Sequence, residues 1–90
     1  MKMTSRKKVL KICENLKKIG CIIEVQESRY SVQMLVRAND EYEQDAMQVR
    51  DIIKQNFINK GYKVKILGTY WIEVFVVDIE KQIKDCFEVE

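Results

Sequence analysis

The sequence predicts an α+β fold in which a helix followed by two strands occurs twice. One amphipathic helical pattern stops at Gly20, a second stops at Gly61, and two strand-like runs follow each of them. A third observation is a short amphipathic pattern behind the second unit, which predicts a closing helix over residues 79–87. The repeat covers residues 5–38 and 40–78, and it supports this order of elements more firmly than any single segment does.

The first helix is expected to begin at Thr4 or Ser5 and to end at Gly20. A hydroxyl oxygen of Thr4 or Ser5 can accept from an unpaired backbone N–H of the first turn. Glycine at the other end can adopt the left-handed conformation that ends many helices. Apolar residues recur at three- and four-residue steps, as on one face of a helix: Val9, Ile12, Cys13, Leu16 and Ile19.

The second helix is expected over residues 40–60. Asp40 can cap it, and Glu43 three residues later completes a pattern that resembles a capping box. Acidic residues crowd its first turns, where the helix dipole favours them. One apolar stripe runs along it: Tyr42, Ala46, Val49, Ile53 and Phe57, with Ile52 beside it.

Four strands are predicted, over residues 21–27, 32–37, 62–66 and 70–77. The second and fourth are the most apolar, so we expect them to pair at the centre of an antiparallel sheet with the order 1-2-4-3. Both helices would then cover one face of the sheet. This topology resembles a circularly permuted ferredoxin-like sandwich, with the first strand moved to the end of the chain. Alternatively, the hairpins of two chains could exchange in a dimer.

Strand alternation assigns the strand residues to two faces of the sheet. We expect one set to face the helices: Ile23, Val25, Val32, Met34, Val36, Val64, Ile66, Ile72, Val74 and Val76. The uncovered face is then predicted to carry Ile22, Glu24, Gln33, Leu35, Arg37, Lys63, Lys65, Trp71, Glu73, Phe75 and Val77. Its apolar area is larger than a monomer usually exposes, which predicts that the closing helix, a second copy or a partner covers it.

The composition indicates a single domain over residues 1–90 and argues against several kinds of site. The chain has no histidine, the commonest general base at neutral pH. Its three cysteines, Cys13, Cys21 and Cys86, include no C-x-x-C pair and are too few for a usual structural zinc site. The three glycines stand far apart and form no phosphate-binding loop. We therefore predict a non-enzymatic protein without cofactor or metal.

The location predicted from the sequence is cytoplasmic. No apolar run approaches the roughly 20 residues that a membrane helix needs. The basic residues near the start are not followed by the apolar segment of a secretory signal. Reduced cysteines fit this compartment.

The predicted function is protein binding through the uncovered sheet face, with a second copy of the chain as one candidate partner. Its site residues would be Leu35, Arg37, Trp71, Glu73, Phe75 and Val77. A compact, lysine-rich, proline-free chain would also suit a phage or mobile-element product that inhibits a host protein.

The alternative function is nucleic-acid binding. Although the net charge of the chain is only +2, the first helix is strongly basic and could contact phosphates. Aromatic and basic residues on a four-stranded sheet also resemble base-stacking RNA modules, although no RNP-like motif is present. The candidate residues are Lys7, Lys8, Lys11, Lys18, Lys63 and Lys65. The acidic start of the second helix (Asp40, Glu41, Glu43 and Asp45) is explained by capping and the dipole, so we predict no metal there.

Overall fold

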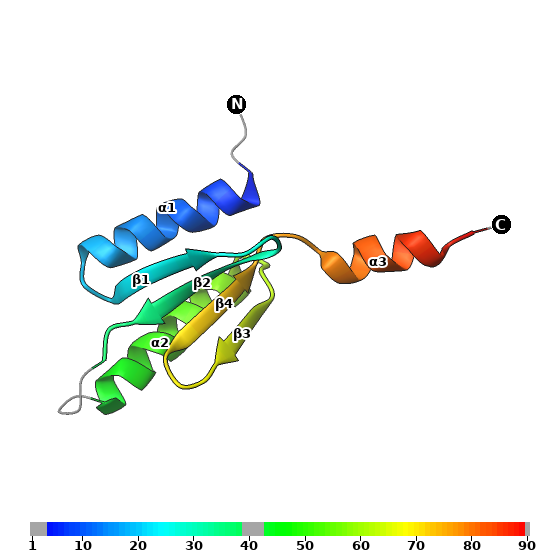
Figure 1. Ribbon diagram of the computed structural model, residues 1–90. Coiled ribbons are helices and arrows are strands. Elements are labelled where there is room, and N and C mark those ends of the chain that lie inside the picture. The colour runs from blue at the N-terminus through cyan, green and yellow to red at the C-terminus, as the bar shows by residue number, and fades with distance from the viewer. Residues whose placement is uncertain (1–3, 39–42, 90) are drawn as a thin grey trace.

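The computed structural model describes residues 4–38 and 43–89, and Figure 1 shows their arrangement. The elements follow the predicted order of helix, strand, strand, twice over, with a closing helix. Their bounds are α1 Ser5–Lys18, β1 Ile22–Glu27, β2 Ser31–Val36, α2 Glu43–Asn59, β3 Val64–Leu67, β4 Trp71–Phe75 and α3 Ile79–Phe87.

The four strands form one antiparallel sheet with the order β1-β2-β4-β3, which confirms the predicted topology. Strands β2 and β4 lie at its centre, and α1 and α2 pack on one face. Between this face and the helices lies a core of fully apolar side chains. It comprises Val9, Cys13, Ile22, Val32, Met34, Val36, Ala46, Ile53, Phe57, Ile72 and Val74.

The ends of α1 follow the sequence prediction. Thr4 is the N-cap, and its Oγ1 accepts from Lys7 N at 3.2 Å. Gly20 has φ 80°, the left-handed conformation in which a side chain would be strained. The cap predicted at Asp40 lies outside the described residues.

The predicted faces of β1 are wrong at its start. Ile22 pairs with Val36 and is fully buried under the helices, whereas Ile23 is 43% exposed. The cause is a β-bulge, because the register shifts between Ile22 and Glu24. A bulge adds one residue to one strand and so reverses the alternation on one side of it. Sequence alternation alone cannot place such an extra residue.

The closing helix α3 forms where predicted but does not cover the sheet. It projects away from the rest of the molecule (Figure 1), and none of its residues is buried. The chain therefore extends 59 × 31 × 22 Å with a radius of gyration of 14.8 Å, against about 12 Å for a compact domain of this length. None of the helices in the described ranges has the length and apolar character needed to cross a membrane.

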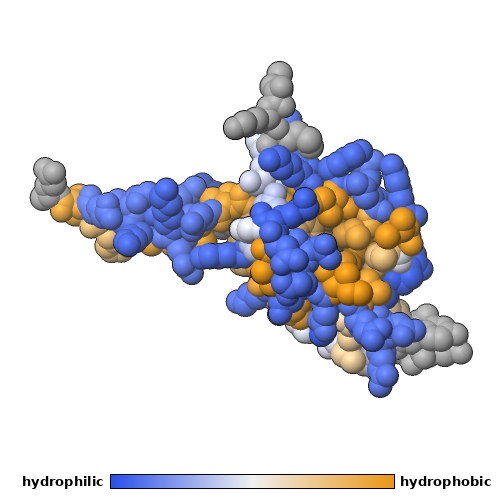
Figure 2. Space-filling model, turned by 180° about the vertical axis from the view of Figure 1, so that it is seen from behind, coloured by the Kyte–Doolittle hydropathy of each residue, from blue (hydrophilic) through white to orange (hydrophobic). Residues whose placement is uncertain are grey.

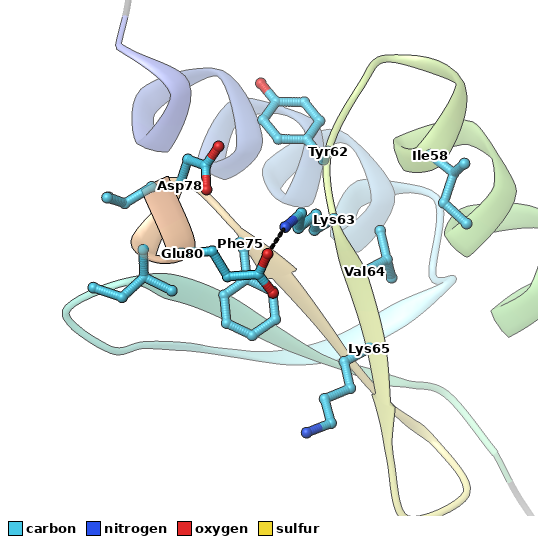
Figure 3. Close-up of a pocket in the computed structure, with 10 residues that line it drawn as sticks. Ile58, Tyr62, Lys63, Val64, Lys65, Phe75, Asp78 and Glu80 are labelled. Atoms are coloured by element: carbon cyan, nitrogen blue, oxygen red, sulfur yellow. Dashed lines mark hydrogen bonds and ion pairs between the residues drawn. The ribbon is translucent and has the colours of Figure 1, made fainter. Parts of the chain in front are cut away.

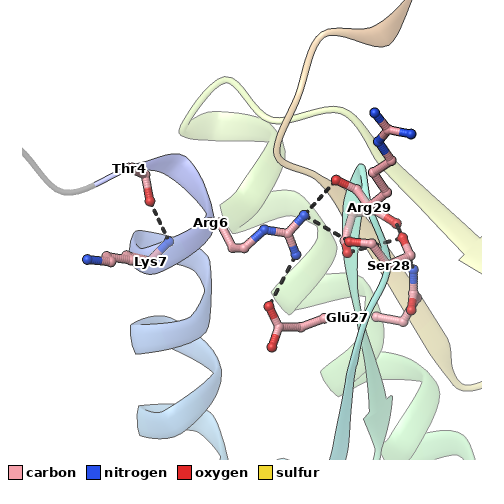
Figure 4. A network of polar contacts seen from close by, with 8 residues as sticks. Thr4, Arg6, Lys7, Glu27, Ser28 and Arg29 are labelled. Carbon is pink, nitrogen blue, oxygen red and sulfur yellow. Dashed lines mark hydrogen bonds and ion pairs between the residues drawn. The ribbon is translucent and has the colours of Figure 1, made fainter.

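Arg6 ties α1 to the β1–β2 turn (Figure 4). Its Nη2 donates to the carbonyl oxygens of Ser28 and Arg29, each at 2.8 Å. Its Nη1 lies 3.2 Å from Glu27 Oε1. A planar guanidinium can reach these acceptors together, so the fork fixes the turn against the start of the helix.

Replacing Arg6 by alanine should lower the free energy of unfolding by about 1–2 kcal/mol, because two turn carbonyls lose a charged donor. Arg6→Lys should recover only part of this loss, since an ammonium lacks the fork. Lys7→Ala is the matched control: its exposed side chain should change stability by less than about 0.5 kcal/mol. Urea unfolding measures the stability of all three variants. Equal stability of Arg6→Ala and Lys7→Ala would mean that the Arg6 side chain does not fix the β1–β2 turn against α1.

Candidate protein-binding surfaces

The sheet face opposite α1 and α2, here called the open sheet face, carries an apolar row at one end. Leu35 on β2 is opposite Trp71 on β4, and Trp71 is opposite Leu67 on β3. Leu35 and Trp71 are half-buried and Leu67 is 37% exposed. Side chains opposite one another on neighbouring strands touch, so the three form one apolar band across three strands.

The next row along the strands is polar. Glu73 on β4 lies between Gln33 on β2 and Lys65 on β3. Its Oε2 accepts from Gln33 Nε2 at 3.0 Å and from Ser31 Oγ at 2.8 Å. Ser31 Oγ also lies 2.7 Å from Ser28 Oγ. This network holds the Glu73 carboxylate in one orientation at the centre of the open sheet face.

The far end of the open sheet face is apolar again. Phe75 is opposite Ser31 in the register, and Val77 follows in the segment that leads to α3. Both are half-buried. Arg37, also predicted for this site, lies at the opposite end of β2, just beyond Leu35, where its Nε donates to Gly20 O at 2.9 Å. The structure thus brings Leu35, Trp71 and Glu73 together in adjacent rows, and sets Phe75 and Val77 apart from Arg37.

A hollow of about 530 Å³ lies between the start of α3 and the β3 edge (Figure 3). Lys63 Nζ and Glu80 Oε2 meet across it at 2.9 Å, and Lys65 points away from this pair. The hydrogen bond from Lys63 to Glu80, together with the negative charge of Glu80, raises the pKa of Lys63. The contact joins the first turn of α3 to the strand edge.

The six lysines of the nucleic-acid alternative do not form one surface. Lys11 and Lys18 both lie near Glu14, at 3.5 and 3.6 Å, and Lys63 pairs with Glu80. The α1 lysines are on the helix-covered side, whereas Lys65 is in the row of Glu73 on the open sheet face. No single groove therefore presents all six charges to one phosphate backbone.

A second apolar surface, which the sequence prediction missed, lies between α1 and α2. We call it the helix groove, and its lining residues are Ile12, Leu16, Ile52, Ile53, Asn56, Phe57 and Lys60. Its volume is about 250 Å³. Figure 2, which views the helix side, shows apolar atoms gathered between the two helices. The sequence signal for this groove was Ile52, which lies beside the main apolar stripe of its helix. In the structure the Ile52 side chain is 61% exposed.

The helix groove continues into a basic hollow towards the start of α1. Lys8, Lys11 and Lys60 line this hollow together with Ile12 and Tyr62. Among the described residues that line the groove and the hollow there is no carboxylate. The helix groove therefore has an apolar floor and a positively charged rim.

Comparison with protein-family models, curated proteins and solved structures finds no match to this chain. Within the described ranges, no group of three or more His, Cys, Asp or Glu side chains could hold a metal ion.

Proposed function

We propose that this chain is a small protein-binding module that docks a protein partner on its open sheet face. The observation that carries the proposal is the uncovered face itself. Trp71 and Phe75 lie on the central strand β4, and the helix that could have covered them points elsewhere. Tryptophan and other aromatic residues at the centre of a surface are typical anchors of protein interfaces.

The order of the rows indicates what the partner should present. Two apolar bands, one at Leu35 and Trp71 and one at Phe75, flank the fixed carboxylate of Glu73. A matching surface would place apolar side chains on both bands and a hydrogen-bond donor between them. Ser31 and Gln33 donate to Glu73 Oε2, and a donor from the partner would further offset the cost of removing this charge from water. Such a surface discriminates among partners more sharply than a wholly apolar one.

The expected result of Trp71→Ala combined with Phe75→Ala is loss of partner binding by more than about a hundredfold, since two aromatic anchors disappear. The partner is first captured from a lysate of the source cells on the immobilised wild-type chain. Its affinity is then measured with purified protein by calorimetry. Ile19→Ala, which removes a 72% exposed apolar side chain from the helix side, is the matched control.

Circular dichroism and urea unfolding of the double variant separate binding from folding. If the variant stays folded and still binds, the open sheet face is not the site. If it unfolds, Trp71 and Phe75 are part of the core, and the proposal fails as well. Capture of a nucleic acid whose binding weakens steeply with salt would support the alternative function instead.

The absence of catalysis, a phage or mobile-element origin and inhibition of a host protein stay predictions from the sequence. The proposed binding does not depend on any of them.

A further inference from the structure

Helix α3 carries an apolar stripe that begins half-buried, at Ile79 beside the hollow on the β3 edge, and is exposed to solvent beyond that point. Ile79, Ile83 and Phe87 recur at four-residue steps and therefore share one side of the helix. Ile83 is 52% exposed and Phe87 is 79% exposed. A nine-residue helix is too short to be stable alone in water, so the stripe needs a surface on which to pack.

The contacts at the start of α3 direct it away from its own chain. Val76 N donates to Tyr30 O at 2.9 Å, which holds the end of β4 against the β1–β2 turn. Asp78 then caps the helix by accepting from Lys81 N, and Glu80 pairs with Lys63. Folding α3 back over its own domain would break the Lys63–Glu80 pair, whereas packing on another molecule leaves it intact.

The helix groove matches the stripe in length and in polarity. At about 1.5 Å per residue, α3 is about 13 Å long, and the groove residues Ile52 to Lys60 extend over about 12 Å of α2, so the two lengths agree. The groove floor, formed by residues such as Leu16, Ile52 and Phe57, is apolar. An amphipathic helix in an apolar groove is a recurring mode of protein recognition.

The charges of the two surfaces are opposite. From Asp78 to Glu88, α3 and its caps hold four carboxylates and two lysines, a net charge of −2. The rim of the groove and its continuation holds Lys8, Lys11 and Lys60. Opposite charges on the rims favour this pairing and disfavour a basic helix in the same groove.

We infer that the chain forms a homodimer in which α3 of each copy packs the exposed Ile83 and Phe87 of its stripe into the helix groove of the other copy. The segment before α3 adjoins Lys8 and Lys60, at the basic end of the groove, and α3 extends outward from there. With a twofold axis near Asp78, each copy can therefore place its α3 in the groove of the other copy, so the same contact forms twice in the dimer. The open sheet face stays free, so this dimer is independent of the proposed partner site.

Sedimentation velocity of the full chain over the micromolar range tests this dimer. The wild type should sediment with twice its monomer mass of 10.7 kDa. Ile83→Gln combined with Phe87→Gln should weaken dimerisation by at least about a hundredfold, because two apolar side chains lose their burial. Both residues are exposed on the single chain, so the variant should keep its fold. Lys81→Gln, on the polar side of the same helix, should stay dimeric.

Ile52→Gln changes the helix groove instead of α3, and this variant should also be monomeric. A mixture of this variant with Ile83→Gln/Phe87→Gln retains one intact helix and one intact groove on different chains. It should therefore form a weak heterodimer that neither variant forms alone. A wild type that is monomeric over the whole concentration range would overturn the inference. If hydrogen exchange then showed that α3 is protected, α3 would be packing on its own chain. A dimer that survives either variant would overturn the inference too.

Discussion

Replacing Phe57 by alanine should lower the free energy of unfolding by about 3–5 kcal/mol, a large part of the stability of a domain this small. Phe57 is 2% exposed and is among the largest fully or nearly buried side chains. Its ring meets that of Tyr62 edge-on, with centroids 6.0 Å apart. The substitution removes the ring from the junction between α2 and the sheet, which leaves a cavity and removes the edge-on ring contact of Tyr62. Urea unfolding followed by far-UV circular dichroism should show a strong decrease of the midpoint.

Ile58→Ala is the matched control for this prediction. Ile58 is the next residue of α2 and is 40% exposed, so less of its side chain is removed from an apolar contact. Its replacement should cost about 1 kcal/mol or less. Similar losses for the two variants would mean that α2 does not pack through Phe57 as described.

The sequence predicted the topology because two kinds of signal agreed. Glycines with positive φ end α1 and α2 at Gly20 and Gly61, and the apolar content of β2 and β4 placed them at the centre. The face of β1 was mispredicted because a bulge depends on the geometry of paired strands, which alternation does not encode. Ile22 and Ile23 are identical in type, so no compositional signal could tell which of them is buried.

The candidate surfaces were predicted in part. Alternation correctly grouped Leu35, Trp71 and Glu73, because their strands are regular there. It could not show that Glu73 is held by Ser31 and Gln33, since that network requires the cross-strand register. The helix groove was missed because its shape depends on the distance between α1 and α2. An apolar stripe does not reveal whether two helices touch one another or leave the core exposed between them.

Raising the pH should weaken the fold through Cys13, whose thiol is buried in the core. Burial raises the pKa of this thiol to about 11, and hydrogen bonding to its own backbone opposes the shift only in part. In the unfolded chain the thiol titrates near its ordinary pKa of 9.0. The folded state therefore holds the proton more tightly, and the stabilisation is fully present below pH 9 and is lost as the pH rises to about 11. Two pKa units correspond to a loss of about 2–3 kcal/mol.

Urea unfolding of the wild type and of Cys13→Ala at a series of pH values isolates this effect. The two proteins share every other titratable group, so the difference between their free energies of unfolding reports the thiol alone. That difference should fall across the window from pH 9 to about 11. Cys86→Ala is the control for an exposed thiol, and its stability should fall in parallel with that of the wild type. A constant difference between wild type and Cys13→Ala would mean that solvent reaches the Cys13 thiol in the folded protein. In that case α1 would pack less closely on β2 than the 3.9 Å distance between Cys13 Sγ and Met34 Sδ implies.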